Sequence, residues 1–87
     1  MTYIIEILRS AQKQLLKTEN PERKRIIESV RKLAEEPRPP GGKKLSARSA
    51  WRIRVGTYRV IYEIHDDKLL VMVLAVGHRR AIYKRMP

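Results

Sequence analysis

The sequence has no cysteine among its 87 residues. Without thiols the chain cannot form a disulfide, a thiolate zinc site or a cysteine nucleophile. Only two histidines remain as common metal ligands, so we expect no metal site. The four glycines also do not fall in the spacing of a phosphate-binding loop, which argues against a nucleotide cofactor. We therefore expect no cofactor of any kind.

Long apolar runs are also missing. No segment reaches the roughly 18 consecutive apolar residues that a membrane-spanning helix needs. The chain does not open with the basic and then apolar stretch of a secretory leader. We expect a soluble, cytoplasmic protein with no membrane partner.

Acidic residues are scarce, with 9 Asp and Glu against 20 Lys and Arg, and the formal net charge is +11. Such a surplus requires an anionic partner. Nucleic acid is the leading candidate, while an acidic protein or a membrane surface would satisfy the same electrostatics. The hydrophobic fraction of 43% is enough for one core in a chain of this length, so residues 1–87 are expected to form a single domain.

The first half of the chain predicts one strand and two helices. Residues 3–8 are rich in β-branched side chains, which favours a strand. Ser10 can cap a helix over residues 10–17, and Asn20 before Pro21 is a second helix start. Apolar residues between 26 and 34 recur at helical spacing until Pro37, which we expect to end the second helix. The proline- and glycine-rich residues 37–42 then form a loop.

From residue 51 onward the apolar period changes from helical to alternating. Strands are predicted over residues 51–55 and 58–64, joined by a tight turn at Gly56, and over 69–76, ended by Gly77. The last strand is apolar throughout, so it belongs inside the sheet. The predicted fold is α+β, with two N-terminal helices packed on one face of a mainly antiparallel four-stranded sheet.

A two-residue turn at 56–57 places Arg54 directly opposite Arg59, with Arg52 on the same face. Two like charges directly opposite each other destabilise a sheet. The size of the effect is similar to the roughly 0.2–1 kcal/mol by which a favourable pair stabilises it. Two readings remain open: solvated residues that keep a sheet edge soluble, or an anion site. On the other face, Trp51, Tyr58 and Tyr62 are expected in the core rather than as stacking partners for bases.

Further basic residues are expected to converge on this cluster. A second turn at Asp66 and Asp67 would pair Arg59 with Leu74 and return residues 77–83 to the same end of the sheet. Guanidinium groups that converge suit phosphate, because each offers a planar fork of donors. The residues predicted to bind RNA are Lys43, Lys44, Arg52, Arg80, Lys84 and Arg85.

Three segments resemble one known family. They are Lys43-Lys44-Leu45, the series R-x-R-x-G-x-Y-R-x-x-Y from Arg52 to Tyr62, and Gly77-His78-Arg79 followed by Tyr83. Together they are similar to the RelE/ParE superfamily of toxins from toxin–antitoxin modules, and most similar to its RelE branch. The resemblance extends over nearly the whole chain.

The resemblance implies an endoribonuclease that cleaves messenger RNA in the ribosomal A site without a metal, by attack of the 2′-hydroxyl on the adjacent phosphate. By position, Arg59 and Arg79 match the family arginines that stabilise the phosphate, and Tyr83 matches a tyrosine that activates the 2′-hydroxyl or stacks on a base. Arg54 and Arg52 stand where the family often has lysines. An arginine cannot give up its proton, so this sequence must supply proton transfer differently or react more slowly.

Nearby cations favour the phenolate form of a tyrosine, which makes Tyr83 the first candidate for the base. His78 is a second candidate acid or base, because imidazole exchanges protons near neutral pH. The implied partners are the ribosome with its messenger RNA and a small, acidic or amphipathic antitoxin. Two other functions compete: a ParE-like poison of DNA gyrase, whose branch usually lacks the arginine and tyrosine set, and a basic RNA-binding module without catalysis.

Overall fold

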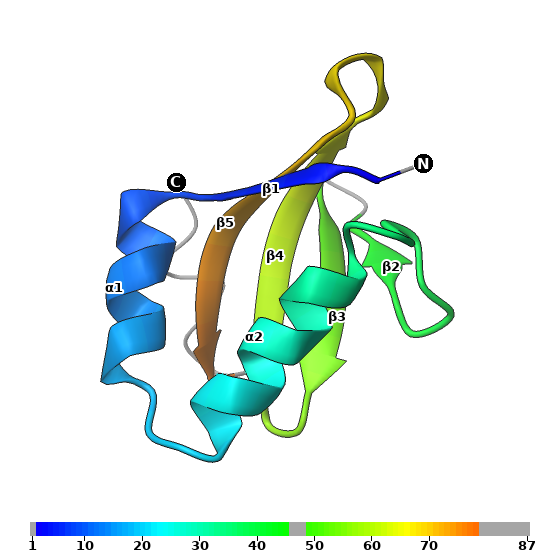
Figure 1. Cartoon of the computed structure of the whole chain (residues 1–87). Helices are drawn as coiled ribbons and strands as arrows, with labels where there is room; N and C mark the ends of the chain where they lie inside the picture. Colours follow the sequence, from blue (N-terminus) through cyan, green and yellow to red (C-terminus); the bar gives the residue numbers. More distant parts are fainter. Residues whose placement is uncertain (1, 46–48, 79–87) are drawn as a thin grey trace.

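The computed structural model describes residues 2–45 and 49–78 (Figure 1). Within them the chain forms two α-helices, five strands and one short 3-10 helix. In chain order these are β1 (Ile4–Ile7), α1 (Arg9–Lys17), α2 (Glu22–Lys32), β2 (Lys43–Lys44), β3 (Trp51–Val55), β4 (Tyr58–His65), the 3-10 helix (Asp66–Lys68) and β5 (Leu70–His78). None of the described helices has the length and apolar character needed to cross a membrane.

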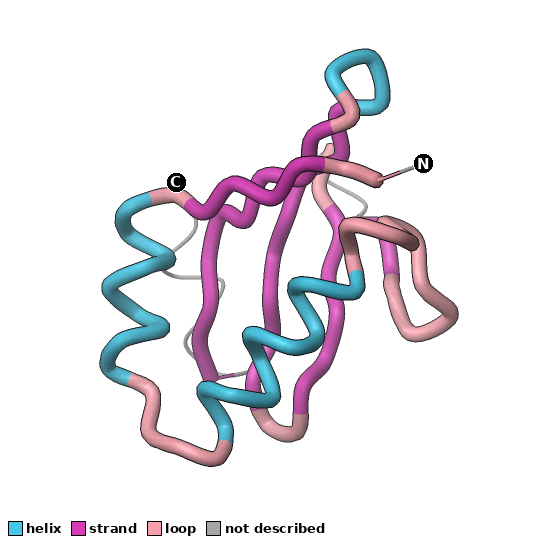
Figure 2. The backbone as a smooth tube through the Cα atoms, in the orientation of Figure 1, coloured by secondary structure: helices cyan, strands magenta, loops and turns pink. Residues whose placement is uncertain are grey.

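The five strands form one mixed sheet in the order β1-β5-β4-β3-β2. β1 runs parallel to β5, and the other three pairings are antiparallel. Both helices lie on the same face of the sheet, α1 against β5 and α2 against β3 and β4 (Figures 1 and 2). The predicted α+β class and its two helices are confirmed. The sheet has five strands rather than four, because Lys43 and Lys44 pair with β3.

The start and end of α2 differ from the prediction. Pro21 itself occupies the N-cap position, and its carbonyl accepts the bond from the Arg25 amide. Asn20 therefore lies one residue too early to cap the helix. At the other end α2 stops at Lys32. The next hydrogen bonds are of the 3-10 type, between residues three apart, such as the bond from the Leu33 N–H to the Val30 carbonyl. The regular helix thus ends before it reaches Pro37.

The main core lies between the helices and the sheet. Ala11 of α1 and Ile26 of α2 are fully buried there against Val60 and Tyr62 of β4. Trp51 and Tyr58 pack against the same cluster, as the alternation of β3 and β4 predicts. A second, smaller cluster that includes Ala50, Ile61 and Ala75 lies on the other face of the sheet. The face that carries Ile61 also carries the arginines of β3 and β4.

The predicted register of the β3–β4 hairpin is confirmed. Val55 lies opposite Tyr58, Arg54 opposite Arg59 and Trp51 opposite Tyr62. Gly56 opens the two-residue turn with φ of +61°, a left-handed conformation in which a glycine has no side chain to clash.

The predicted register between β4 and β5 is wrong, because Arg59 lies opposite Gly77 rather than Leu74. The turn between these strands spans four residues instead of two, and its last residue, Leu69, has a left-handed backbone with φ of 48°. A register shift after Ile61 adds one more residue. Gly77 therefore continues the ladder, and β5 extends to His78, two residues further than predicted.

Candidate nucleic-acid interface

The sheet face that points away from the helices carries three arginines, Arg52, Arg54 and Arg59, which we call the arginine face. Ile53 and Val60 belong to the helix-side core, so the residues that alternate with them point the opposite way. Arg54 on β3 lies directly opposite Arg59 on β4. The predicted placement of these three side chains on one face is confirmed.

Arg54 and Arg59 form the type of antiparallel pair in which the two Cα atoms lie closer together. A two-residue turn makes Val55 and Tyr58 a hydrogen-bonded pair, so the next pair along is non-hydrogen-bonded, with Cα atoms about 4.5 Å apart. On the other side Arg59 lies opposite Gly77, which is buried. Two arginines are thus held directly opposite each other on adjacent strands, an arrangement that suits an oxyanion.

Arg52 is the buried member of the arginine face, with only 9% of its surface exposed. It lies opposite Ile61 of the small core cluster and, on its other side, opposite Lys43 of β2. Its Nε atom is buried and has no hydrogen-bond partner in the described part of the chain. A buried donor without a partner costs about 1–3 kcal/mol, and a bound anion would remove that cost.

The two lysines of β2 do not share one face. Lys43 lies opposite Arg52 and extends the arginine face, whereas Lys44 lies opposite Trp51, whose ring packs on the helix side. Both side chains are exposed. The structure therefore brings Lys43, and not Lys44, into the predicted cluster.

The structure does not bring His78 to the arginine face. His78 lies opposite Tyr58, and the two rings meet edge to face with their centroids 5.9 Å apart. Tyr58 packs against the helix-side core, so His78 is placed on that side of the sheet. The expected role of His78 as a second acid or base depended on its lying close to the arginines, and the structure places it on the other face of the sheet.

Five predicted site residues lie outside the described residues: Arg79, Arg80, Tyr83, Lys84 and Arg85. Their roles stay predictions. The described part of β5 reaches His78, one residue past Gly77, which lies opposite Arg59.

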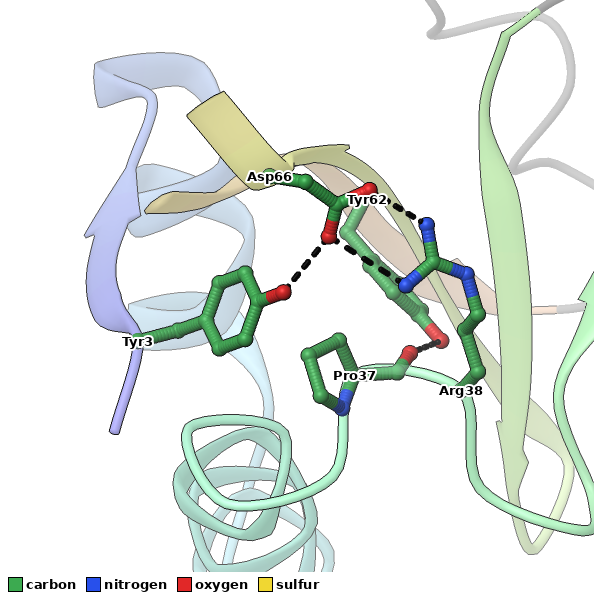
Figure 3. Close-up of polar contacts among 5 residues, drawn as sticks. All are labelled: Tyr3, Pro37, Arg38, Tyr62 and Asp66. Carbon is green, nitrogen blue, oxygen red and sulfur yellow. Dashed lines mark hydrogen bonds and ion pairs between the residues drawn. The ribbon is translucent and has the colours of Figure 1, made fainter. Parts of the chain in front are cut away.

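A polar cluster that the sequence did not indicate joins three distant segments (Figure 3). Arg38 donates two hydrogen bonds to Asp66, from Nη2 to Oδ2 at 2.8 Å and from Nη1 to Oδ1 at 3.3 Å. Tyr3 donates its hydroxyl proton to Oδ1 of the same carboxylate at 2.5 Å. The Arg38 guanidinium carbon also lies 5.6 Å from the centroid of the Trp51 ring. The loop after α2 is thus tied to the turn after β4 and to the start of β3.

Tyr62 fixes the start of the same loop. Its side chain is fully buried, and its hydroxyl donates to the Pro37 carbonyl at 2.8 Å (Figure 3). Burial raises the pKa of Tyr62 to about 12. Further along the loop, a Cβ on Gly42 would come within 3.2 Å of the Pro39 carbonyl, so this close approach favours glycine. These contacts position the loop that delivers Lys43 to Arg52.

The charges of the Arg38 cluster shift the acidity of its members. The Arg38 guanidinium, and then the Tyr3 hydroxyl, lower the pKa of Asp66 by donating to its charged form. The hydrogen bond to Asp66 in turn raises the pKa of Tyr3, because a phenolate there would lose the bond and repel the carboxylate. Asp66 is therefore ionised wherever the fold is studied near neutral pH.

Replacing Asp66 by asparagine should lower the urea midpoint of unfolding slightly at neutral pH. The effect is small because the pair is exposed, with 47% of the Arg38 and 55% of the Asp66 side chain in contact with solvent. Since folding lowers the pKa of Asp66, its contribution is present above the unfolded pKa and is lost as pH falls through the folded pKa. Urea titrations of both proteins should converge in acid, and a gap that persists there would contradict this account.

No group of three His, Asp or Glu side chains that could hold a metal ion occurs in the described ranges 2–45 and 49–78. The cations of the arginine face can bind a phosphate and stabilise added negative charge. None of these arginines can act as a base.

Comparison with known proteins identifies the family. Residues 5–83 match the family model described as ParE toxin of type II toxin-antitoxin system, parDE. This chain belongs to the RelE/ParE toxin superfamily. A RelE-like toxin protein of Escherichia coli is 25% identical over 81 residues, which cover 91% of this chain and 85% of that protein. Toxin RelG of Mycobacterium tuberculosis is 50% identical over 32 residues, 37% of each chain.

Solved structures of RelE toxins share the fold of this RelE/ParE toxin. The RelBE2 toxin–antitoxin complex of M. tuberculosis matches with a TM-score of 0.80 and 29% identity, covering 91% of this chain and 100% of the other. The archaeal RelE–RelB complex from Pyrococcus horikoshii matches with a TM-score of 0.81 and 28% identity, covering 91% and 97%. A mutant of E. coli RelE in the free state matches with a TM-score of 0.83 and covers 99% of this chain and 95% of the other. At 24% identity this match shows similarity of fold only.

Proposed function

We propose that this RelE/ParE toxin acts as a single domain that cleaves messenger RNA in the ribosomal A site and thereby inhibits translation. The observation that carries the proposal is the placement of Arg54 directly opposite Arg59 on adjacent strands. Like charges placed directly opposite each other destabilise a hairpin, and an anion bound between them would offset that cost. The RelE names of its relatives point to the same branch of the superfamily.

The proposed reaction is a transesterification without metal. A base removes the proton of the ribose 2′-hydroxyl, the oxygen attacks the adjacent phosphorus, and the bond to the 5′-oxygen breaks. A 2′,3′-cyclic phosphate and a protonated 5′-hydroxyl result. Arg59 and Arg79 stabilise the charge of the pentavalent phosphate, and Arg54 adds to the field.

Proton transfer falls to a group other than the arginines. Tyr83 is the proposed acceptor, since His78 lies on the Tyr58 side of the sheet. Arg52, Lys43 and the basic residues Lys44, Arg80, Lys84 and Arg85 are proposed to hold the RNA backbone and the ribosome by charge.

We further propose that a small, acidic or amphipathic antitoxin holds this toxin inactive. The net charge of +11 requires an anionic partner, and several similar structures are toxin–antitoxin complexes. A reading frame for such a protein next to this one would support the assignment.

A second candidate is a poison of DNA gyrase, which the match to a ParE model favours. Primer extension on translated messenger RNA separates the two, and also a plain RNA-binding module. Cuts that recur with the codon period support the endoribonuclease. Absence of cuts together with an induced DNA-damage response supports the gyrase poison, and absence of both supports the RNA-binding module.

A further inference from the structure

A pocket of about 220 Å³ lies where the end of α1 meets the end of β5 (Figure 1). We call it the α1–β5 pocket. Lys17 and Thr18 form its helix side, and Tyr58 and His78 form its strand side. Sites for drug-sized ligands usually measure roughly 300–1,000 Å³. The α1–β5 pocket therefore has room for a single planar ring system rather than for a larger molecule.

His78 gives the α1–β5 pocket an exposed aromatic ring. The imidazole meets the ring of Tyr58 at an angle of 79°, and Tyr58 is itself packed against the helix-side core. His78 is exposed, so its ring keeps surface for a ligand. Because Tyr58 already holds the ring, little side-chain freedom would be lost on binding. Histidine is one of the residues on which RNA bases stack, so the ring suits a flat ligand.

The edge of β5 that faces α1 supplies polar groups to the same pocket. Gln14 Oε1 accepts a hydrogen bond of 2.9 Å from the Val76 N–H, so this N–H points out of the sheet towards α1. β1 does not cover this edge, because its last pairing in the described part of the chain joins Ile7 to Val73. His78 is two residues after Val76, so its N–H and C=O point to the same side. Together with the NH2 group of Gln14, they can bond to the edge of a ligand.

The end of α1 disfavours a phosphate in the α1–β5 pocket. The C-terminus of a helix carries a partial negative charge, because its last carbonyls have no partner within the helix. Thr18 satisfies two of them, since its N–H donates to the Leu15 carbonyl and its hydroxyl donates to the Gln14 carbonyl. Lys17 offsets part of the remaining charge. A phosphodiester has only acceptors, whereas a nucleobase combines a flat face with donors and acceptors along its edge. A nucleobase therefore matches the pocket better.

We propose that the α1–β5 pocket binds one nucleobase of an RNA whose phosphates lie on the arginine face. His78 stacks on the base, and the NH2 group of Gln14 bonds to its edge. The pocket lies at the same end of the sheet as Arg59, because Tyr58 precedes Arg59 on β4 and His78 follows Gly77, the residue opposite Arg59. An RNA strand that passes over this end can leave a phosphate on one face and place a base on the other. That this RNA is the cleaved message rests on the proposed function.

Short RNAs that cannot be cleaved test the proposal on the full chain without the ribosome. Four-nucleotide RNAs of adenine, cytosine, guanine or uracil are made with 2′-O-methyl riboses, together with one that has the same backbone and no bases. Affinities are measured at one salt concentration, because phosphate contacts make them depend on salt. The preferred base should bind at least about fivefold more tightly than the RNA without bases, as stacking on a side chain typically gives. Equal affinities would overturn the proposal.

Variants at His78 locate the bound base. In His78→Ala the advantage of the intact RNA over the RNA without bases should fall about fivefold or more, whereas a loss of charge alone would weaken both RNAs equally. His78→Phe keeps an aromatic face and should keep the advantage. His65→Ala is the matched control, because it removes the same side chain at the other end of β4, and it should change the advantage by no more than about twofold. An unchanged advantage in His78→Ala, or an equal loss in His78→Phe, would overturn the proposal.

The unmodified chain provides a check that does not depend on the folding of a variant. The intact RNA should shift the NMR signals of the His78 amide and of the Gln14 side-chain NH2 group. The RNA without bases should leave both signals in place. If the intact RNA moves neither signal, the base does not enter the α1–β5 pocket and the proposal is wrong.

Two further measurements keep the outcomes apart. The nucleoside monophosphate of the preferred base lacks the other phosphates, so it should bind about tenfold more weakly than the RNA or worse. Equal affinity would assign the pocket to a free nucleotide and overturn the proposal. Ribosome-dependent cleavage by the unmodified chain is measured in parallel. A chain that binds the base through His78 and does not cleave keeps this inference and refutes the proposed function, and a chain that cleaves with no effect of the base at His78 does the reverse.

Discussion

Alanine at Arg59 should abolish growth arrest, and alanine at Arg79 should do the same. Each arginine is proposed to stabilise the negative charge that builds up on the reacting phosphate. Loss of one such donor typically lowers the rate of the chemical step by about 10²–10³-fold. Single-turnover cleavage of messenger RNA on programmed ribosomes measures the loss directly. Both variants should still bind the antitoxin.

The matched control is Lys24→Ala, which removes one exposed cation from α2 without touching the arginine face. It should cleave at a rate close to that of the unmodified protein. Arg59→Lys keeps the charge and loses the planar fork of donors, so it should retain part of the activity. If the double variant Arg59→Ala, Arg79→Ala still arrests growth, the assignment of the site is wrong.

Truncation of Tyr62 to alanine should cause the largest loss of stability. The ring is fully buried between the helices and the sheet, and removal of a buried aromatic ring costs about 3–5 kcal/mol. A chain of this length is stabilised by about 4–13 kcal/mol in total, so the variant should be largely unfolded or close to it. Urea unfolding followed by circular dichroism gives the free energy of unfolding.

Tyr62→Phe isolates the hydroxyl from the ring. It keeps the packing and removes the bond to the buried Pro37 carbonyl, which should cost about 0.5–1.5 kcal/mol. The pKa of Tyr62 is raised by folding to about 12, so its contribution is complete below the unfolded pKa and is lost as pH rises towards the folded one. The phenylalanine variant should therefore lose less stability in alkali. A Tyr62→Ala protein as stable as Tyr62→Phe would contradict the core placement of the ring.

The hairpin was predictable because its signals are local. The alternation from Trp51 to Tyr62 and the glycine at the turn allow one register when one face must be buried, and the structure has that register. The cluster of arginines on one face follows from the same alternation. The family resemblance also rests on these residues, since the proposed catalytic arginines Arg54 and Arg59 are part of the hairpin pattern.

The features that the sequence did not predict correctly depend on residues far apart in the chain. The β4–β5 register depends on a left-handed backbone at Leu69 and on a bulge, and neither has a residue signature at those positions. His78 was expected near the arginines, but Gly77 continues the strand and so shifts His78 to the other side of the sheet. The bond between Arg38 and Asp66 joins residues 28 positions apart, and their spacing gives no hint of it. An arginine after Pro37 and an acidic turn were visible, but their contact appears only once the sheet is assembled.

The most direct test of the proposed chemistry uses purified toxin and ribosomes programmed with a messenger RNA whose A-site codon carries either a free 2′-hydroxyl or a 2′-O-methyl group. The account predicts a cut in the first RNA, with a 2′,3′-cyclic phosphate on the upstream fragment, and none in the methylated one. Equal cleavage of both, or cleavage of neither, would contradict it.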